Sequence, residues 1–341
     1  MERFDVAIVG GGPVGLVASI EARLAGLTVV VIEQRDGTID KACGEGLMPG
    51  ALPALGRLGV DPDGMPIMGI TYNQGARSVS HRFVGTPGRG VRRTTLHDAL
   101  SRRADELGVV RVVSKVDSLS QTADEVEVAG MSARYLLASD GLHSTVARLV
   151  GLALPAPKRS RRYGIRQHYA TAPWGDTVEI YYGRQAEIYV TPIAPNEVGV
   201  AMLGAQHTDF DRAIADIPEL AARLGGVPLL SSRRGAGPFR QRTRARTVGR
   251  VLLVGDASGY VDAITGEGLR LGFAQATAAI GCVVDDDPHR YEAEWKRITR
   301  DFRVTTTALV RFATSPLRRG IVPLSTALPR RFGAVVELLA R

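Results

Sequence analysis

Gly10, Gly12 and Gly15 follow an apolar stretch directly and stand before a helical pattern. At this spacing the first glycine permits a tight turn, the second lets backbone N–H groups approach a pyrophosphate, and the third allows a helix to pack closely on a strand. Glu33 lies where an acidic side chain is expected to accept a hydrogen bond from a ribose hydroxyl. The combination predicts a dinucleotide site rather than a merely glycine-rich turn.

Two later turns combine glycine with an acidic residue at the end of an apolar run, namely Asp140-Gly141 and Gly255-Asp256. An aspartate at a strand end is suited to accept a hydrogen bond from a sugar-like hydroxyl of a nucleotide cofactor. Gly266-Glu267-Gly268 then opens a helix, whose N-terminus offers free N–H groups and a positive dipole to a negatively charged group. We therefore expect these turns, rather than the first glycine turn alone, to determine which dinucleotide binds.

The segment from Arg240 to Arg246 carries four arginines at every second position, which places them on one face of an extended chain. Such a face docks the 2′-phosphate of NADPH or an acidic carrier protein. The alternative is a solvated edge strand whose charges discourage aggregation. Nucleic-acid binding is not expected, because no aromatic stacking platform accompanies the charge.

The cysteines and histidines carry less information. The two cysteines and six histidines form no metal-ligand spacing, so we expect no metal ion. Cys43 lies in a glycine-rich loop, where it is either an active-site thiol or a small residue that suits a tight loop. Cys282 lies in an apolar helical stretch and is expected in the core. So few cysteines favour the reducing cytoplasm over a secreted scaffold.

The elements that position these residues are predicted from the hydrophobic period. Residues 4–9 predict a buried strand, 14–25 a helix and 28–32 a second strand, which together complete a βαβ unit. Further expectations are a helix over 95–107, short strands over 109–113, 115–120, 125–128 and 134–138, antiparallel strands over 163–203, an amphipathic helix over 209–224, a buried strand over 248–254 and mainly helical chain after residue 267.

Length and composition limit the class of protein. A chain of 341 residues exceeds the ~100–200 residues of a typical domain, so we expect two domains. The apolar fraction of 45% and charged fraction of 23% exclude a disordered or fibrous chain. The net charge of +8 favours anionic partners. No apolar run reaches the ~20 residues of a membrane span, and no signal peptide is expected.

With these motifs in this order, residues 1–285 resemble the FAD-dependent oxidoreductases that combine an N-terminal GxGxxG, a central DG motif and a late GD motif. That superfamily contains the group A flavin monooxygenases, or aromatic hydroxylases, together with the flavin halogenases and the geranylgeranyl reductases. The resemblance implies that FAD is held by the residues that match these motifs and by their neighbours. The implied FAD-binding residues are Gly10, Gly12, Gly15, Glu33, Gln34, Arg35, Gly44, Arg93, Val116, Asp140, Gly141, Gly255, Asp256, Gly266, Gly268 and Leu269.

The sequence departs from the family pattern in ways that bear on function. The usual DGxxSxVR reads from Asp140 to Arg148 with its arginine displaced by one position, so the contact of Arg148 stays open. The segment 255–268 is nearer to the geranylgeranyl-reductase version, and the loop 41–47 is similar to the cysteine-glycine loop of that branch. Both tryptophans are isolated, so the Trp-x-Trp signature of the halogenases is absent and halogenation ranks last.

The resemblance implies an α/β fold in which a doubly wound Rossmann-like FAD-binding domain carries an antiparallel-sheet substrate domain and a helical C-terminal segment. We expect the FAD-binding domain to comprise residues 1–75, 92–160 and 245–285, the substrate domain residues 76–91 and 161–244, and the C-terminal segment residues 286–341. The stretch 309–341 combines apolar clusters with arginines. It either lies on a membrane surface or packs against the FAD-binding domain and closes the pocket.

Two activities are compatible with the resemblance. The first is a monooxygenase of secondary metabolism that uses FAD and NADPH or NADH to hydroxylate an aromatic or polyketide-like small molecule through a flavin C4a-hydroperoxide. The alternative is an FAD-dependent reductase that passes hydride to a carbon–carbon double bond. Cys43 is the one candidate catalytic side chain, and a flavin-binding regulator is the non-enzyme alternative. We expect a cytoplasmic protein whose partner is a small-molecule substrate, with peripheral membrane or carrier-protein contact left open.

Overall fold

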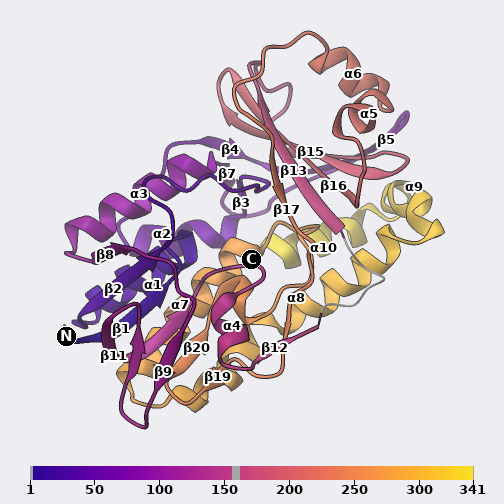
Figure 1. Cartoon of the computed structure of the whole chain (residues 1–341). Coiled ribbons are helices and arrows are strands. Elements are labelled where there is room, and N and C mark those ends of the chain that lie inside the picture. Colours follow the sequence, from indigo (N-terminus) through magenta and orange to yellow (C-terminus); the bar gives the residue numbers. More distant parts are fainter. Residues whose placement is uncertain (1–2, 156–161, 341) are drawn as a thin grey trace.

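The structure is a computed structural model that describes residues 3–155 and 162–340, arranged in two lobes (Figure 1). The first lobe is built on an eight-stranded sheet in which five neighbouring strands run parallel. In spatial order these are β20 (Val251–Leu253), β11 (Met131–Ala138), β1 (Arg3–Val9), β2 (Val29–Glu33) and β8 (Val110–Val113). Antiparallel pairings add β19 (Thr247–Val248), β9 (Leu119–Gln121) and β10 (Val126–Val128).

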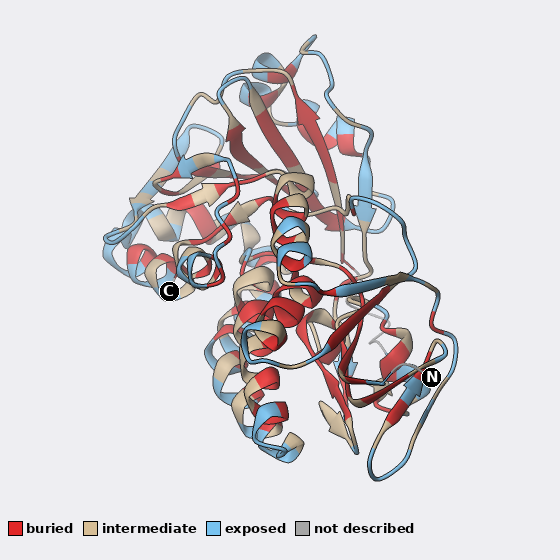
Figure 2. Cartoon of the chain, turned by 90° about the vertical axis from the view of Figure 1, so that its left-hand side faces the viewer, coloured by how far each residue is buried: buried red, intermediate tan, exposed pale blue. Residues whose placement is uncertain are grey.

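Both faces of this sheet are covered, which explains why its strands are apolar throughout rather than alternating. In β1, Val6 and Ile8 pack on one face against three helices, while Ala7 and Val9 pack on the other face near β10 and a short helix. The three helices are α1 (Pro13–Leu24), α3 (Arg93–Glu106) and α7 (Gly268–Val284), and the short helix is α4 (Thr145–Leu149). Figure 2 shows the central strands as buried and the outer helix faces as exposed.

The second lobe is a seven-stranded sheet, antiparallel except for the pairing of β14 with β5. Its order is β17 (Arg234–Ala236), β13 (Arg162–Tyr169), β16 (Glu197–Ala205), β15 (Ala186–Ala194), β14 (Val178–Tyr182), β5 (Gly69–Gln74) and β6 (Arg77–Arg82). One face packs on α5 (Phe210–Ala215) and α6 (Pro218–Leu224). The other face turns toward the first lobe and the C-terminal helices.

Short elements join the two lobes and close the chain. Small antiparallel pairings are made by β3 (Gly46–Leu47), β4 (Met65–Ile67) and β7 (Gly88–Gly90), and by β12 (Ala153–Leu154) with β18 (Arg242–Thr243). The remaining helices are α2 (Leu52–Arg57), α8 (Tyr291–Ala313), α9 (Ile321–Ala327) and α10 (Pro329–Ala340), with 3-10 turns η1 (Pro49–Ala51), η2 (Gly255–Ser258), η3 (Pro288–Arg290) and η4 (Pro316–Gly320). None of the described helices combines the length and the apolar character that crossing a membrane requires.

The first βαβ unit lies within one or two residues of its predicted bounds, but other predicted elements differ. The strand expected over 248–254 is divided by a turn at residues 249–250 into β19 and β20, which pair antiparallel. The single amphipathic helix expected over 209–224 is two helices, because Pro218 has no N–H to continue α5 and instead starts α6. The strand expected over 115–120 forms only at β9, and residues 115–118 are not in a strand. β5, which the domain prediction groups with residues 1–75, pairs within the second sheet.

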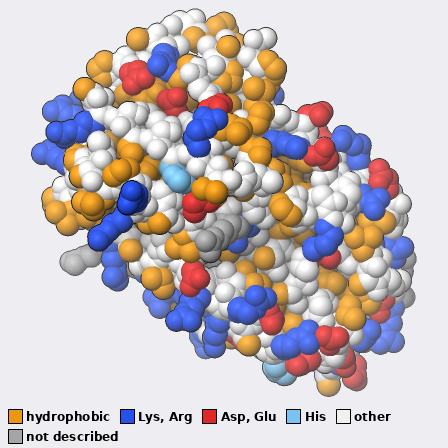
Figure 3. Space-filling view, turned by 180° about the vertical axis from the view of Figure 1, so that it is seen from behind, with side chains coloured by type: hydrophobic (Ala, Val, Ile, Leu, Met, Phe, Trp, Pro, Cys, Tyr) orange, Lys and Arg blue, Asp and Glu red, His pale blue; other side chains and the backbone are white. Residues whose placement is uncertain are grey.

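The arginine segment 240–246 is not the continuous strand that its period of two predicts. Arg240 has a positive φ of 72°, and only Arg242–Thr243 is paired as a strand, with β12. The positive φ at Arg240 and the bends at Arg244 and Arg246 interrupt the alternation, so the segment is not one regular edge strand. Lys and Arg side chains are scattered over both lobes on the face seen in Figure 3, with acidic side chains between them.

Candidate active site

The glycine turn connects β1 to α1 with the geometry that its spacing predicts. Gly10 has a φ of 108° and donates a backbone hydrogen bond of 2.8 Å to Ile32 at the end of β2. A Cβ on Gly15 would overlap the carbonyl oxygen of Gly10, so helix and turn pack as closely as only glycine allows. At Gly12, by contrast, an added Cβ would meet only the Arg93 guanidinium, at 4.0 Å. The helix N-terminus therefore faces open space.

Glu33 is fixed beside this turn by two backbone donors. Its Oε2 accepts a hydrogen bond of 2.9 Å from Gly11, and its Oε1 accepts one of 3.1 Å from Arg35. A carboxylate oxygen has a second lone pair, so each can still accept a hydroxyl donor. Glu33 thus lies next to the helix N-terminus with acceptor capacity remaining.

A single cavity of about 330 Å³ runs along the carboxyl ends of the parallel strands and on to the second sheet. Open α/β sheets bind their ligands at this edge. Gly15 lies outside the cavity and acts through packing. The other predicted site residues all line it, together with Cys43: Gly10, Gly12, Glu33, Gln34, Arg35, Gly44, Arg93, Val116, Asp140, Gly141, Gly255, Asp256, Gly266, Gly268 and Leu269.

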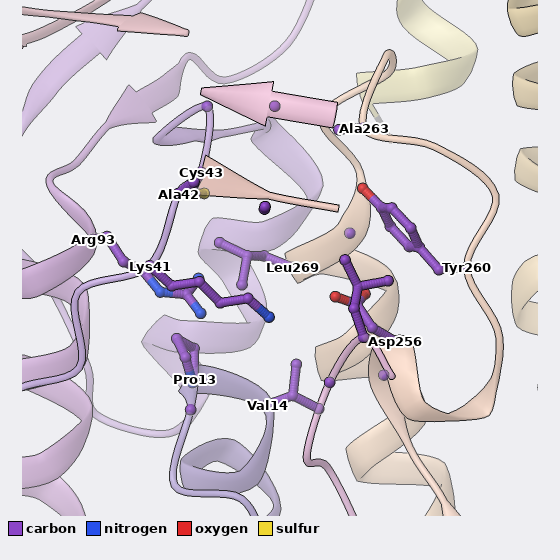
Figure 4. A pocket seen from close by; sticks show the side chains of 18 of the residues that line it. Pro13, Val14, Lys41, Ala42, Cys43, Arg93, Asp256, Tyr260, Ala263 and Leu269 are labelled. Atoms are coloured by element: carbon purple, nitrogen blue, oxygen red, sulfur yellow. The ribbon is translucent and has the colours of Figure 1, made fainter. Parts of the chain in front are cut away.

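Two cations project into the cavity from one side, and an acid projects from the other. Lys41 and Arg93 extend toward the centre, where Asp256 faces them (Figure 4). Neither cation forms an ion pair with another described residue, and Nε of Arg93 has no hydrogen-bond partner there. Burial raises the pKa of Asp256, and the charges of Lys41 and Arg93 oppose that rise. The unmatched cations suit a polyphosphate.

Asp140 is held by the helix that follows it. Its Oδ2 accepts hydrogen bonds of 2.7 Å and 3.1 Å from the backbone N–H groups of Thr145 and Val146 at the start of α4. Its Oδ1 is buried and has no partner among the described residues, and burial raises the pKa of the carboxyl. The orphaned oxygen is an acceptor left for a ligand hydroxyl, so Asp140 and Arg93 both fit a nucleotide such as FAD.

The Gly-Asp turn forms the opposite wall and depends on two glycines with positive φ, Gly255 at 64° and Gly266 at 69°. The N–H of Gly255 donates a hydrogen bond of 2.8 Å to the Gln275 side chain of α7, which anchors the turn. Gly268 begins α7 and lines the cavity, so this helix also directs its N-terminus toward the ligand space.

Two residues left open by the sequence now have positions. Arg148 is exposed and bonds its own helix, through a 2.9 Å hydrogen bond to the Thr145 hydroxyl, and it does not line the cavity. Cys43 is half-buried at the cavity wall, where its sulfur accepts a 3.4 Å hydrogen bond from the backbone N–H of Glu45. The displaced arginine of the DG motif is therefore a surface residue, while the thiol borders the site.

A buried ionic network fixes the Cys43 loop against the second sheet, and the sequence did not indicate it. Arg166 pairs with Asp40 and donates to Nδ1 of His168, at 3.1 Å. Because a guanidinium can only donate, Nδ1 of His168 accepts, and its Nε2–H donates to Glu45 at 2.7 Å. Glu45 itself has a φ of 59° and also accepts a 3.0 Å hydrogen bond from the backbone N–H of Arg93. This network sets the position of the loop from 40 to 45.

Beyond the loop the cavity becomes apolar. Its walls there come from β5, β14, β15 and β16 of the second sheet, from the segment between β17 and β18, and from the chain that follows the Gly-Asp turn. The apolar side chains are Ile70, Val178, Ile180, Tyr189, Met202, Leu203, Phe239 and Ile264. The Tyr189 hydroxyl is already used, because it donates to the carbonyl oxygen of Ile264 at 3.3 Å. The cavity therefore has a polar half, which suits a nucleotide, and an apolar half, which suits an apolar molecule.

Comparison with solved structures agrees with this architecture. The fold is similar to that of p-nitrophenol 4-monooxygenase from Pseudomonas putida, with a TM-score of 0.80 over 100% of this chain and 97% of that one, at 20% identity. At that identity the likeness concerns the fold. It extends over both lobes and the C-terminal helices.

Several curated proteins are similar in sequence. Dialkyldecalin synthase from Streptomyces rugosporus is 29% identical over 80% of this chain and 63% of its own length. Digeranylgeranylglycerophospholipid reductase 2 from Methanopyrus kandleri is 26% identical, over 86% and 82%. 3-(3-hydroxy-phenyl)propionate/3-hydroxycinnamic acid hydroxylase from Mycolicibacterium gilvum is 26% identical, over 98% and 64%. The chain thus spans less than two thirds of the first and third of these relatives. Residues 3–281 match the FAD binding domain family, so this chain belongs to that family and is an FAD-dependent oxidoreductase.

Proposed function

We propose that the protein is a monooxygenase that uses NADPH or NADH to hydroxylate an aromatic or polyketide-like small molecule. The observation that carries this proposal is the continuity of the cavity, which runs from the glycine turn to the apolar face of the second sheet. Among the similar curated proteins is a hydroxylase of phenolic acids that aligns with 98% of this chain. A flat, mostly apolar substrate suits a chamber of this lining.

Bound FAD supplies the electron transfer from the nicotinamide and the reaction with oxygen. The residues of the chain provide position and environment. Lys41 and Arg93 neutralise the phosphates, while Glu33, Asp140 and Asp256 accept hydroxyl donors from the sugar and the ribityl chain.

Arg166 is a polar group of the cavity that could orient a substrate. Its side chain is 1% exposed and lines the cavity. Its Nε–H has no hydrogen-bond acceptor among the described residues, although Nε lies 3.7 Å from Oε1 of Glu45. A buried N–H without a hydrogen-bond acceptor costs free energy unless a ligand atom accepts a hydrogen bond from it. A phenolic or carboxylate oxygen of the substrate provides that acceptor, while Phe239 and Ile264 exclude water from the reacting carbon.

A reductase of carbon–carbon double bonds is the second candidate, and two observations favour it. The Cys43 loop, which is similar to that of the geranylgeranyl reductases, borders the cavity and is fixed there by the Glu45 network. The reductase from Methanopyrus kandleri also matches this chain over 82% of its own length, against 64% for the hydroxylase. A prenyl chain would occupy the same apolar walls.

The requirement for oxygen separates the two activities. Under ¹⁸O₂, with NADPH and a panel of phenolic, polyketide and polyprenyl compounds, the monooxygenase places one labelled atom in its product. A reductase forms a product heavier by two hydrogens that carries no label, and it turns over under strict anaerobiosis with reduced FAD. Anaerobic turnover to an unlabelled, reduced product would overturn the hydroxylase proposal and support the reductase.

A further inference from the structure

A second cavity of about 760 Å³ lies behind the Gly-Asp turn, on the side away from the FAD cavity. Its lining holds seven basic side chains and one carboxylate, that of Asp256, among the described residues. The basic residues come from the segment 240–246 and from α8: Arg240, Arg242, Arg246, Lys296, Arg300, Arg303 and Arg311. We call this cavity the arginine groove.

The contribution of α8 follows from helical geometry. Lys296, Arg300, Arg303 and Arg311 are spaced by four, three and eight residues, which places them on one face of a helix. The acidic residues of the helix do not line the groove. Glu294, for example, pairs instead with Arg297 at 2.7 Å, and Arg297 does not line the groove either. The charged side chains that α8 contributes to the groove are therefore all basic.

Most of these cations are not neutralised. Among residues 3–155 and 162–340, only Arg246 of the seven forms an ion pair, with Glu292 at 3.7 Å. The one carboxylate in the wall among the described residues is Asp256, whose pKa is raised by burial against the opposing charges of Lys41 and Arg93. Seven like charges around one cavity repel each other, and a bound polyanion relieves that repulsion.

Two of the guanidinium groups are already held in place by a tryptophan. The guanidinium carbon of Arg246 lies 3.7 Å from the centroid of the Trp295 ring, and that of Arg303 lies 4.8 Å from it. Nε of Arg246 is buried without a partner among the described residues. Desolvation lowers the pKa of both arginines, and at Arg246 the charge of Glu292 opposes this shift. Stacked guanidiniums with free N–H groups bind phosphate oxygens in pairs.

The rest of the lining limits the class of anion. Apolar walls are supplied by Leu154, Val261, Leu271, Trp295 and Phe302. An inorganic ion would fill a small part of the groove and leave this surface in contact with water. The lining suits a ligand that has both a phosphate group and an organic body.

We propose that the arginine groove is a binding site for a phosphate-bearing organic ligand, distinct from the FAD site. Its phosphate oxygens bind Arg246, Arg300 and Arg303, and its organic part lies along the wall of Trp295 and Phe302. The ligand is either a nucleotide such as the 2′-phosphate end of NADPH or a phospholipid headgroup, since both present the same phosphate chemistry.

The floor of the groove is the back of the turn that borders the FAD cavity. Nε1 of Trp295 donates a 2.8 Å hydrogen bond to the Ser258 hydroxyl, and Thr243 donates one of 2.6 Å to the Ser258 carbonyl oxygen. Asp256 and Tyr260 line both cavities. A ligand that settles on Trp295 therefore contacts the support of the FAD-binding turn.

Calorimetric titration of the FAD-saturated protein tests the site, because bound FAD prevents a phosphate probe from entering the first cavity. The probes are adenosine 2′,5′-bisphosphate, pyrophosphate, and vesicles of phosphatidylcholine with or without phosphatidic acid. We expect saturable binding of at least one probe with an organic body. The double variant Arg300→Gln with Arg303→Gln should weaken it at least about tenfold.

The matched control removes two exposed arginines outside the groove, by Arg297→Gln with Arg319→Gln, and should change the affinity less than about twofold. Tight binding of the bisphosphate assigns a nucleotide, and binding of acidic vesicles alone assigns a lipid. The proposal is overturned if no probe saturates, if pyrophosphate binds as tightly as the organic probes, or if both double variants weaken binding equally. The readout is binding, so a failure leaves the proposed hydroxylation untouched.

Discussion

Oε2 of Glu33 lies 2.9 Å from the backbone nitrogen of Gly11, so the last residue of β2 is hydrogen-bonded to the glycine turn that follows β1. The two parallel strands are thereby joined at their carboxyl ends, where the nucleotide binds. The same carboxylate that would accept a ribose hydroxyl also holds the turn in shape. Binding and preorganisation are therefore coupled in one side chain.

Replacing Glu33 by Ala should weaken FAD binding about 10- to 100-fold, since one charge-assisted hydrogen bond contributes ~1.5–3 kcal/mol. Glu33→Gln retains an oxygen for Gly11 and should lie between Ala and the wild type. Flavin fluorescence gives the dissociation constants on reconstitution of the apoprotein. An Ala variant that binds FAD as tightly as the wild type would contradict the role of Glu33.

Lys41 should matter for FAD although it is not among the FAD-binding residues that the resemblance implies. In the wild type, the Lys41 cation faces Asp256 across the cavity, and its charge lowers the pKa of the Asp256 carboxyl. Replacement of Lys41 by Met removes this cation. We expect about tenfold weaker FAD binding. Because the pKa of Asp256 then rises, its acceptor is lost at a higher pH, and flavin release on acidification should begin earlier than in the wild type.

A suitable control is Lys296→Met. Lys296 lies outside the FAD cavity, and its replacement by Met removes the same charge as Lys41→Met. Filtration at a series of pH values, with absorbance of the retained flavin, measures both effects. Identical retention curves for Lys41→Met and Lys296→Met would show that only net charge matters.

The parts of the site that could be predicted from the sequence are those set by local geometry. A turn that requires positive φ selects glycine, so Gly10, Gly255 and Gly266 mark the cavity wall directly. The strands beside them are buried on both faces and read as apolar runs. Motif and fold therefore coincide over short stretches of chain.

The remaining site residues could not be predicted, because they meet only through the tertiary fold. Glu45 and His168 are 123 residues apart, and nothing in the loop 41–47 that contains Glu45 indicates His168 as its partner. The Arg240–Arg246 period predicted a regular strand that forms only at Arg242–Thr243, although Arg240, Arg242 and Arg246 still line one groove beside α8. Periodicity describes a regular segment and contains no information on where a turn interrupts it.

Glu267 provides a test of stability against pH. It is buried at the start of α7, and burial raises its pKa to about 7, although Arg270 pairs with it at 2.5 Å. A raised pKa means that the native state keeps a proton that the unfolded chain releases above its ordinary value near 4.5. The resulting stabilisation is complete below that value and is lost as the pH rises through 7.

Relative to Glu267→Gln, the wild type should therefore lose on the order of 2 kcal/mol of unfolding free energy between pH 5 and pH 8. Urea unfolding at both pH values with saturating FAD gives the four free energies. A difference between wild type and variant that is constant, or that grows in favour of the wild type at pH 8, would refute the raised pKa.

The lobes are also joined by a buried ion triad, and its removal should be destabilising. Arg162 of β13 pairs with Glu187 of β15 and, at 3.0 Å, with Asp262 of the chain that follows the Gly-Asp turn; all three side chains are at most 7% exposed. Arg162→Met leaves Asp262 without an ion-pair partner among the described residues and leaves Glu187 with only Arg318, which lies 3.7 Å away. We expect this loss to cost ~3–5 kcal/mol.

The cost of Arg162→Met arises from the buried carboxylates that lose this cation, so neutralising those carboxylates should restore stability. We expect the triple variant Arg162→Met, Glu187→Gln, Asp262→Asn to recover most of the lost free energy, because amides need no cation. The single variant should also regain stability on acidification, since Glu187 and Asp262 have pKa values already raised by burial and take up protons readily. Urea unfolding of the three proteins at pH 5 and pH 7.5 measures both effects. If the triple variant is no more stable than the single one, the methionine itself disturbs the packing between the lobes, and the triad has no electrostatic role.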